Sequence, residues 1–209
     1  MPPVWVAARD EIAELQRERS TKKKYSRQWR VLNKRIARLY SKASKVADNW
    51  ARETARQLVG KSDVVVLEDL KLANMTRSAR GTVEEPGSNV AAKAALNRRM
   101  SEAALGRLRA RICTRAEEAG CRVWAVPAHH TSQECAACGH IAKENRVSRD
   151  RFSCVNCGHS NQADVNAAVN IAARGATAEA AWRDAGSPLL VRPAPRLRRR
   201  KEAAVPLAA

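Results

Sequence analysis

The chain has 209 residues, enough for one moderate domain with appendages, and Lys and Arg outnumber Asp and Glu by 39 to 21. The resulting formal charge of +18 favours a polyanionic partner, most simply nucleic acid, over an anionic membrane surface. No apolar run approaches the ~18–20 residues that a membrane-spanning helix needs, and no secretory signal is visible. These features exclude an integral membrane protein and predict a cytoplasmic one without a membrane partner.

Residues 1–60 are expected to form a basic helical hairpin. Residues 4–19 suit a helix with Ile12 and Leu15 inward, and a second helix follows with apolar residues at alternating steps of three and four, a heptad seam. The seam consists of Trp29, Leu32, Ile36, Leu39, Ala43, Val46 and Trp50. The basic side chains either form a solvated face or contact the phosphates of a nucleic-acid backbone. Because they outnumber the acidic side chains in this segment, contact with phosphates is the favoured interpretation. The candidate nucleic-acid contacts are Lys22, Lys23, Lys24, Arg27, Lys34 and Arg35.

The next segments predict an α/β core. The β-branched run 63–67 suits a parallel strand that is buried on both faces, and residues 121–126 suit a second strand. Between them, residues 91–119 read as one long helix, with Leu96, Met100, Leu105, Leu108 and Ile112 inward. Another helix starts at 164–173, and the Ala- and Pro-rich residues after Gly175, with RLRRRK at 196–201, predict a disordered basic tail.

Four cysteines form a C-x2-C…C-x2-C array, which is the spacing of a zinc ribbon. They are Cys135, Cys138, Cys154 and Cys157. Each pair can reach one ion from a tight turn, and Gly follows the second cysteine of each pair, where a positive φ is often needed. Four thiolates leave no corner for water, so the Zn²⁺ would be structural rather than catalytic. Two disulfides are the alternative, and the intracellular character of the chain favours zinc.

Two acidic residues stand out by position. Glu68 ends the predicted buried strand, and Asp164 begins the helix after the cysteine array. Carboxylates at such places converge on the crevice where α/β proteins bind ligands, and a converging set can hold Mg²⁺. From spacing alone, however, the simpler interpretation is that Asp164 stabilises a helix N-terminus and that Glu68 is an ordinary surface acid.

Three segments carry a resemblance to a known family. They are VVVLEDLKLANM (64–75), GCRVWAVPAHHTSQECAACGHIAKENRVSRDRFSCVNCGH (120–159) and ADVNAAVNIAARG (163–175). They closely resemble the C-terminal half of the TnpB/OrfB proteins of bacterial insertion sequences, in the same order over about residues 4–175. The TSQ-x-C-x2-CG and DVNAA-x-NI motifs are the most specific parts of this match.

The resemblance implies a partial ribonuclease H-like (RuvC) domain with an inserted zinc ribbon, in a protein that is guided by RNA and cuts DNA with Mg²⁺. It implies a role in transposition and DNA recombination, in the bacterial cytoplasm near the nucleoid. The family's catalytic Glu falls on Glu68 and its last catalytic Asp on Asp164, which makes both more plausible as Mg²⁺ ligands than as caps. The expected division is a hairpin (1–60), a RuvC-like core (61–130), the zinc ribbon (131–160), a last helix (161–175) and a tail (176–209).

One part of the family pattern does not match. The family's first catalytic Asp lies in a motif of the type G-I-D-x-G, and the sequence contains no such motif. With one of three carboxylates missing, the chain alone is expected to cleave little or no DNA, so its status as an enzyme stays open. The alternatives are a nuclease-dead nucleic-acid-binding module or regulator and a basic zinc-ribbon structural protein. The oligomeric state is left open.

Overall fold

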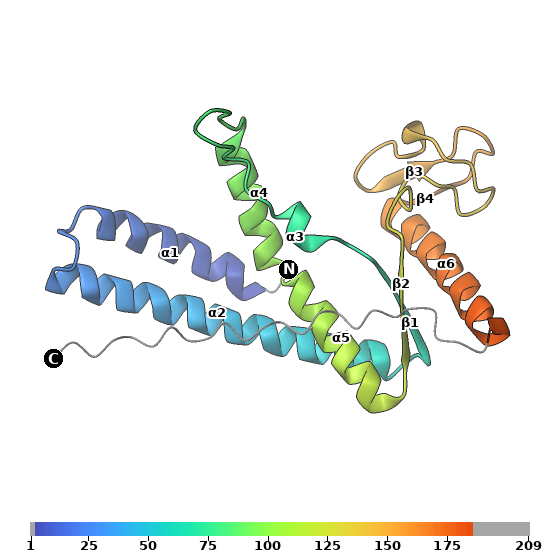
Figure 1. Cartoon of the computed structure of the whole chain (residues 1–209), viewed down its shortest axis with the longest axis horizontal. Coiled ribbons are helices and arrows are strands. Elements are labelled where there is room, and N and C mark those ends of the chain that lie inside the picture. Colours follow the sequence, from blue (N-terminus) through green and yellow to red (C-terminus); the bar gives the residue numbers. More distant parts are fainter. Residues whose placement is uncertain (1–2, 186–209) are drawn as a thin grey trace.

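The structure is a computed structural model that describes residues 3–185 as an elongated arrangement, with a helical arm at one end and a small β ribbon at the other (Figure 1). In chain order the elements are α1 (Pro3–Ser20), α2 (Arg27–Val59), β1 (Val64–Glu68), α3 (Leu72–Met75), α4 (Val90–Glu102), α5 (Leu105–Ala119), β2 (Arg122–Val126), the 3-10 helix η1 (Lys143–Asn145), β3 (Arg151–Ser153), β4 (Ser160–Gln162) and α6 (Ala163–Ala185). Within this described part, no helix is long and apolar enough to cross a membrane.

Helices α1 and α2 lie side by side and run in opposite directions, joined by a short turn (Figure 1). Ile12 and Leu15 of α1 pack against Leu32 and Ile36 of α2, and all four side chains are buried. The side chain of Ser26 accepts a hydrogen bond from the Trp29 N–H at 3.2 Å and caps α2. The inward positions predicted for α1 are therefore confirmed.

The predicted heptad seam holds only in the first half of α2. Val46 is 37% exposed, and the buried residues from Ala43 onward recur at every fourth position. They are Ala43, Ala47, Ala51, Ala55 and Val59. Such a four-residue row is the ridge by which two helices cross in globular proteins, and α5 packs on it. The small alanines let α5 approach closely, so the partner of the helix changes from α1 to α5 along its length.

The side chains of the two paired strands alternate between the two faces of the sheet. β1 and β2 pair in parallel, with Val66 opposite Trp124 and Glu68 opposite Val126. Val65 and Leu67 pack with the cluster of α2 and α5 on one face. Since successive side chains of a strand point to opposite faces, Val66 and Glu68 face α6 on the other.

The strand predicted at 63–67 was expected to be buried on both faces, and this was wrong. All five residues of β1 are half-buried. The reason is that β2 is the one strand paired with β1 among residues 3–185, so the other edge of β1 has no neighbour there. Apolar residues on that side remain partly exposed.

The single helix predicted over 91–119 is two helices. α4 ends at Glu102 and α5 starts at Leu105, and Ala104 between them adopts a positive φ of 56°. The break redirects α5 onto α2, and it leaves Leu96 49% exposed, contrary to the inward position predicted for it. Leu105, also predicted inward, is likewise exposed.

Helix α6 extends further than predicted. It runs from Ala163 to Ala185, so residues 176–185 of the expected disordered tail are helical. Residues 186–209, with the basic run 196–201, lie outside the described part of the chain.

Candidate metal centres

The four array cysteines meet at one point. Their sulfur atoms all lie within 4.8 Å of one another. Cys135 and Cys157 are 3.7 Å apart, and so are Cys138 and Cys154. Tetrahedral zinc with Zn–S bonds of ~2.3 Å places its sulfurs about 3.8 Å apart, whereas a disulfide bond measures ~2.05 Å. The geometry therefore fits a four-coordinate metal ion, and the disulfide alternative does not fit.

The two cysteine turns have the same backbone. In each, the N–H of the first cysteine donates to the carbonyl of the residue after the glycine, at 2.9 and 2.8 Å. The glycine N–H returns a hydrogen bond to the first cysteine's carbonyl, at 2.8 and 3.0 Å. Gly139 and Gly158 have φ values of 75° and 73°, as the Gly positions predicted. This repeated turn is what aims two thiols at a common point.

Crowded sulfurs cannot all ionise without a cation between them. The backbone of His140 is the main group that lowers the pKa of Cys138, to about 6. At Cys157 the backbone of His159 also lowers the pKa, but the neighbouring sulfurs outweigh it and raise the pKa to about 12. Ionisation of one cysteine thus disfavours ionisation of its neighbour. A dication would stabilise all four thiolates together, which is the donor set that zinc prefers.

A buried asparagine fixes the two turns to each other. The Asn145 amide donates to the carbonyls of Gln133 and His140 at 2.8 and 3.0 Å, and its oxygen accepts the Val155 N–H at 3.0 Å. The side chain is fully buried, and it has partners on both its donor and its acceptor sides. Phe152 of β3 fills the small core beside Cys135 and Cys154.

Helix α6 holds the ribbon by side chains spaced four residues apart. Asn166 accepts the Ala136 N–H at 3.0 Å and donates to the Glu134 carbonyl at 2.7 Å. One turn later, Asn170 donates to the carbonyls of Thr131 and Glu134 at 3.0 and 2.7 Å. Both asparagines are buried, so these hydrogen bonds are shielded from water.

The next turn of α6 continues the row with Arg174. Its guanidinium donates to the carbonyls of Pro127 and His129 at 2.7 and 2.9 Å and contacts Glu134 at 2.6 Å. The three positions 166, 170 and 174 lie on one face of the helix. Together they tie α6 to the backbone that connects β2 with the first cysteine turn.

Glu68 and Asp164 line one open pocket of about 410 Å³ between β1, α6 and the ribbon. The Thr131 hydroxyl, 4% exposed, donates to Glu68 Oε1 at 2.7 Å. The side chain of Asp164 is 77% exposed, and Arg146 of the ribbon lies 3.6 Å from its Oδ1. The structure thus brings together the two acids that the sequence singled out, with a hydroxyl on one and a guanidinium near the other.

The neighbouring acid Asp69 is not part of this pocket. It pairs with Lys71 and lies 3.3 Å from Arg109 of α5. The hydrogen bond from Lys71, with help from Arg109, lowers the pKa of Asp69 below its ordinary value, so it stays ionised in its ion pairs. Among residues whose side chains are described, no third carboxylate lines the pocket.

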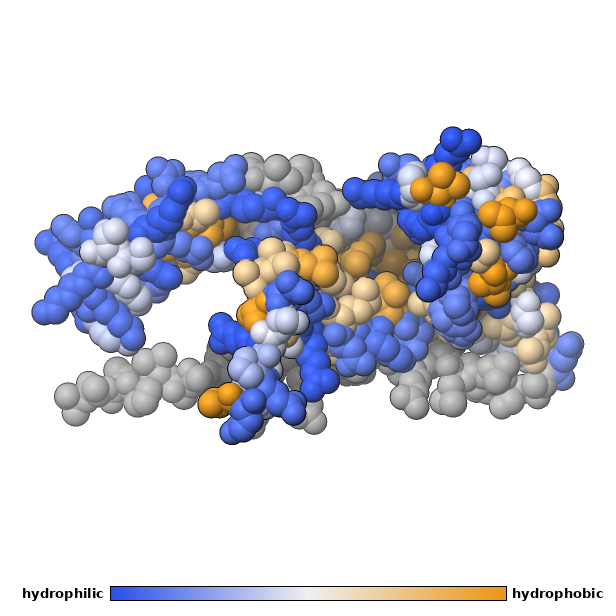
Figure 2. All heavy atoms as spheres, turned by 90° about the horizontal axis from the view of Figure 1, so that it is seen from above, coloured by the Kyte–Doolittle hydropathy of each residue, from blue (hydrophilic) through white to orange (hydrophobic). Residues whose placement is uncertain are grey.

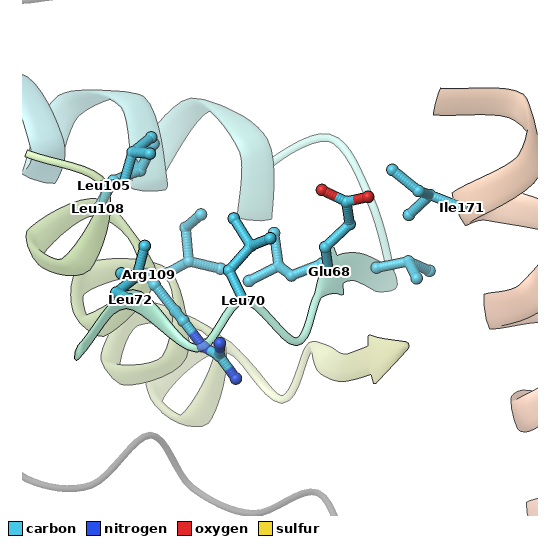
Figure 3. Close-up of a pocket in the computed structure, with 10 residues that line it drawn as sticks. Glu68, Leu70, Leu72, Leu105, Leu108, Arg109 and Ile171 are labelled. Atoms are coloured by element: carbon cyan, nitrogen blue, oxygen red, sulfur yellow. The ribbon is translucent and has the colours of Figure 1, made fainter. Parts of the chain in front are cut away.

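An apolar hollow adjoins the acidic pocket. It is lined largely by leucines and other aliphatic side chains, with Glu68 at its edge between Leu70 and Ile171 (Figure 3). In the surface view, hydrophobic residues gather in the middle of the molecule, between a mostly hydrophilic end on the left and an end of mixed character on the right (Figure 2). The lining residues include Val66, Leu67, Leu72, Leu105, Leu108 and Ile112.

The predicted nucleic-acid contacts lie elsewhere. Lys23, Lys24, Arg27 and Lys34 are exposed at the turn and in the first half of α2. Lys22 is half-buried, and Arg35 pairs with Glu11 of α1 at 2.9 Å. This end of the molecule lies opposite the ribbon and α6 (Figure 1). The structure therefore groups these residues with one another and not with Glu68 and Asp164.

Sequence reasoning missed the groups that position the site. Thr131 and Arg146 lie between residues 120 and 159, among the cysteines, and Asn166, Asn170 and Arg174 follow Asp164 between residues 163 and 175. The signal available was the four-residue spacing of polar residues along a predicted helix, which places them on one face.

Fold and site define a class: an α/β protein whose parallel strands are followed by a four-cysteine ribbon docked on the next helix. Two family models match consecutive parts of the chain. Residues 6–79 match an OrfB-type family described as "Probable transposase", and residues 106–171 match the "Cas12f1-like, TNB domain".

Relatives with curated names agree with these matches. The chain is 40% identical over 164 residues to the Escherichia coli K12 protein named "Putative RNA-guided DNA endonuclease InsQ". It is 45% identical over 65 residues to the Cas12f1 endodeoxyribonuclease of Sulfoacidibacillus thermotolerans. These matches make the chain similar to the OrfB-type transposase family and to its RNA-guided endonuclease relatives. The first match covers 78% of the chain but 41% of the relative, and the second covers 31% and 15%, so the chain spans less than half of these proteins.

Two solved structures resemble the fold. A Cas12f1–sgRNA–target DNA complex matches with a TM-score of 0.47 and 20% identity, over 77% of this chain and 41% of the other. The mini-RNA-guided endonuclease CRISPR-Cas phi3 matches with a TM-score of 0.48 and 25% identity, over 74% and 23%. Both scores lie below 0.5, so neither likeness establishes the fold by itself.

Proposed function

We propose that the chain carries the Glu- and Asp-bearing part of a RuvC-like, Mg²⁺-dependent DNA endonuclease that acts under RNA guidance in bacterial transposition. The observation that supports this most is the shared pocket of Glu68 and Asp164, which come from β1 and α6. The family-model matches and the names of the relatives agree with it.

The four cysteines are proposed to hold structural Zn²⁺. All four corners of the tetrahedron are sulfur, so no coordination position remains for a substrate or a water. The ribbon would then act by placing Thr131 and Arg146 against the two acids. This assigns the metal a role in positioning and none in the cleavage step.

Glu68 and Asp164 are the proposed ligands of Mg²⁺ in the pocket. Bound magnesium would supply Lewis-acid stabilisation of a phosphodiester and a lowered pKa for its water. The hydroxyl of Thr131 fixes which oxygen of Glu68 is free to face the pocket. Arg146, a rigid fork of N–H donors close to Asp164, is placed to contact a phosphate oxygen of the substrate.

A third carboxylate is needed for a full two-metal site, and we place it next to β1. The edge of β1 that β2 does not use has no partner among the described residues. A parallel strand paired there would end beside Glu68, because parallel strands end at the same edge of a sheet. The acid would thus come from a segment outside the described residues, and the chain alone should cut DNA poorly.

A second candidate function is nucleic-acid binding without cleavage. Its support is the +18 charge together with a pocket that two acids line. The phosphate contacts would come from the exposed lysines and arginines of the turn and of α2.

A chimera tests the first proposal. The residues of the InsQ relative that precede its match would be fused to Met1, and the fusion tested for cleavage of supercoiled plasmid in Mg²⁺. We expect cleavage by the chimera, none by the chain alone, and loss of cleavage with Glu68→Gln or Asp164→Asn. Asp69→Asn is the matched control, because Asp69 lies outside the pocket.

Equal cleavage by the chimera with and without Glu68→Gln would contradict the nuclease proposal. A chimera that binds plasmid, folds with its zinc and never cuts would instead support the nuclease-dead alternative.

A further inference from the structure

The turn between α1 and α2 places a bulky aromatic residue where glycine is preferred. The Ser26 N–H donates to the Lys23 carbonyl at 3.0 Å and closes a four-residue turn. Tyr25, at the third position, has a φ of 66°. Glycine or asparagine is usual at such a position, because a Cβ is strained there. A tyrosine in this conformation is a genuine outlier.

Packing does not account for this tyrosine. Its side chain is 60% exposed, and its aromatic contact is an edge-on one with Trp29, with ring centroids 5.4 Å apart. Local cations surround the pair of rings. The Lys24 amine lies 4.9 Å from the Tyr25 ring centre, and the Arg19 guanidinium lies 5.6 Å from the Trp29 ring centre.

The charge around the two rings is strongly positive. Residues 17–30 include seven basic side chains and one acidic one. The basic residues are Arg17, Arg19, Lys22, Lys23, Lys24, Arg27 and Arg30. A polyanion is thus drawn to a tip that also presents an exposed aromatic ring.

We propose that this tip binds an unpaired nucleotide, with the base stacked on Tyr25 and the flanking phosphates on Lys22, Lys23 and Lys24. Every base has a π face, so such a site is tolerant of sequence, and it requires bases that are not already stacked in a duplex. The inference deepens the proposed function, on which its choice of nucleic acid rests. It assigns the arm to a single-stranded segment of RNA or DNA.

The test measures binding of the whole purified chain to labelled oligonucleotides of about 12 nucleotides, as single-stranded DNA, single-stranded RNA and duplex DNA. Tyr25→Leu keeps the branching near the backbone and removes the ring. We expect it to weaken single-strand binding roughly tenfold and to leave duplex binding unchanged. Tyr25→Phe should bind as the parent does. Tyr40→Leu, which removes the other tyrosine of the chain from the surface of α2, should have no effect.

Two further variants separate stacking from charge and from folding. Tyr25→Gly relieves the strained backbone, so its Tm should equal or exceed that of the parent while its single-strand binding falls. Lys23→Ala should weaken single-strand and duplex binding alike and reduce the salt dependence, whereas Tyr25→Leu should leave the salt dependence as it was.

The proposal would be overturned if Tyr25→Leu weakened binding to single strands and to duplex equally, or if it weakened binding to neither. A preference for RNA over DNA, or the reverse, identifies which single strand the tip takes. None of these readouts uses cleavage, so a chain that never cuts DNA can still show stacking at the tip, and a cutting enzyme can fail this test.

Discussion

Thr131 is the residue on which the geometry of Glu68 depends. Its hydroxyl donates to the carboxylate at 2.7 Å, and its own carbonyl is held by Asn170 of α6 at 3.0 Å. One buried residue therefore joins β1, the ribbon and α6. We propose that it orients the acid and does not itself touch substrate.

Replacing Thr131 with Val keeps its shape and removes the hydroxyl. We expect cleavage by the chimera to fall about 10–100-fold, as for other outer partners of metal ligands, while the zinc content stays at one per chain. Thr131→Ser should restore most of the activity, because serine keeps the donor. Equal activity of the Val variant and the parent would show that Glu68 needs no such support.

Cys135 is one of two array cysteines that are buried in the ribbon core, so its removal tests the metal site directly. Structural zinc contributes on the order of 10 kcal/mol in small modules. We expect Cys135→Ser to lose bound zinc by elemental analysis and to unfold the ribbon by circular dichroism. Cys113→Ser is the control, since Cys113 lies on α5 outside the cluster. Full zinc retention by Cys135→Ser would be incompatible with four-thiolate coordination.

At the scale of elements, α6 approaches the sheet closely at Gly175. A Cβ on this residue would come within 2.2 Å of a Val66 methyl group. The glycine thus lets the helix lie directly on β1 and places the first turn of α6 beside the end of the strand.

Gly175→Ala should push α6 off β1. We expect it to lower the free energy of unfolding by about 1–3 kcal/mol in chemical denaturation, and Val66→Ala should partly compensate it. Gly106→Ala is a matched change on α5, where the nearest atom, a Leu72 methyl, lies 3.5 Å away. Without a clash there, alanine should be neutral or stabilise the helix by up to about 1 kcal/mol. Identical effects of the two substitutions would refute the close approach.

The second half of α6 is held to β2 through Glu179. Its carboxylate accepts from the Trp124 indole at 2.7 Å and pairs with Arg122 and Arg183 at 3.0 and 3.2 Å. Burial raises the pKa of Glu179, but the Trp124 hydrogen bond and the two guanidinium groups outweigh it and lower the pKa below its ordinary value of 4.5.

A lowered pKa in the folded protein makes this contact sensitive to acid. The stabilisation by Glu179 is complete above about pH 4.5 and is lost as the pH falls through the lower folded pKa. We therefore expect the Tm difference between the parent and Glu179→Gln to be largest near neutral pH and to shrink on acidification. A difference that stays constant down to the lowest pH at which both fold would argue against an ionised Glu179.

At the scale of the whole molecule, the two ends have different chemistry. The arm of α1 and α2 carries exposed cations and lies away from the ribbon and α6 (Figure 1). The four cysteines cluster in the ribbon, and the two pocket acids come from β1 and α6. We propose that the arm gives affinity and that the pocket holds the cutting site.

This division predicts a strong salt effect on binding. Each phosphate contact contributes about 0.9 to the slope of log K against log salt on duplex DNA. Converting Lys34 and Arg27 together to Ala should lower that slope by up to about 2, with Cys113→Ser as a neutral control. Binding that does not change with salt would mean that the positive charge does not drive the interaction.

Local pattern was enough for some features and not for others. The spacing of the cysteines predicted their convergence, because a zinc ribbon is built from two short turns of fixed geometry. The burial of Ile12 and Leu15 followed from helical periodicity. The break at Ala104 could not be predicted, because residues 100–105 contain neither Gly nor Pro and the nearest glycine, Gly106, lies inside α5.

The candidate site shows the same division. The positions of Glu68 at a strand end and Asp164 at a helix start were readable from the sequence. The rules of α/β folds allowed the two acids to converge, but only the family resemblance favoured this over a capping role for Asp164 and a surface position for Glu68. Their partners were not readable, since Thr131 reaches Glu68 across 63 positions. The four-residue row of alanines on α2 was likewise hidden, because the sequence does not say which neighbour each half of a long helix will meet.

The row of polar side chains on α6 donates mostly to main-chain oxygens; the row consists of Asn166, Asn170 and Arg174. The acceptors include the carbonyls of Pro127, His129, Thr131 and Glu134. Such docking depends on the path of the loop and little on which residues it carries. Substitutions of exposed loop residues such as His129 can therefore accumulate without detaching the ribbon. A zinc ribbon from another protein, transplanted here with the same loop backbone, should therefore dock on α6 through the same hydrogen bonds.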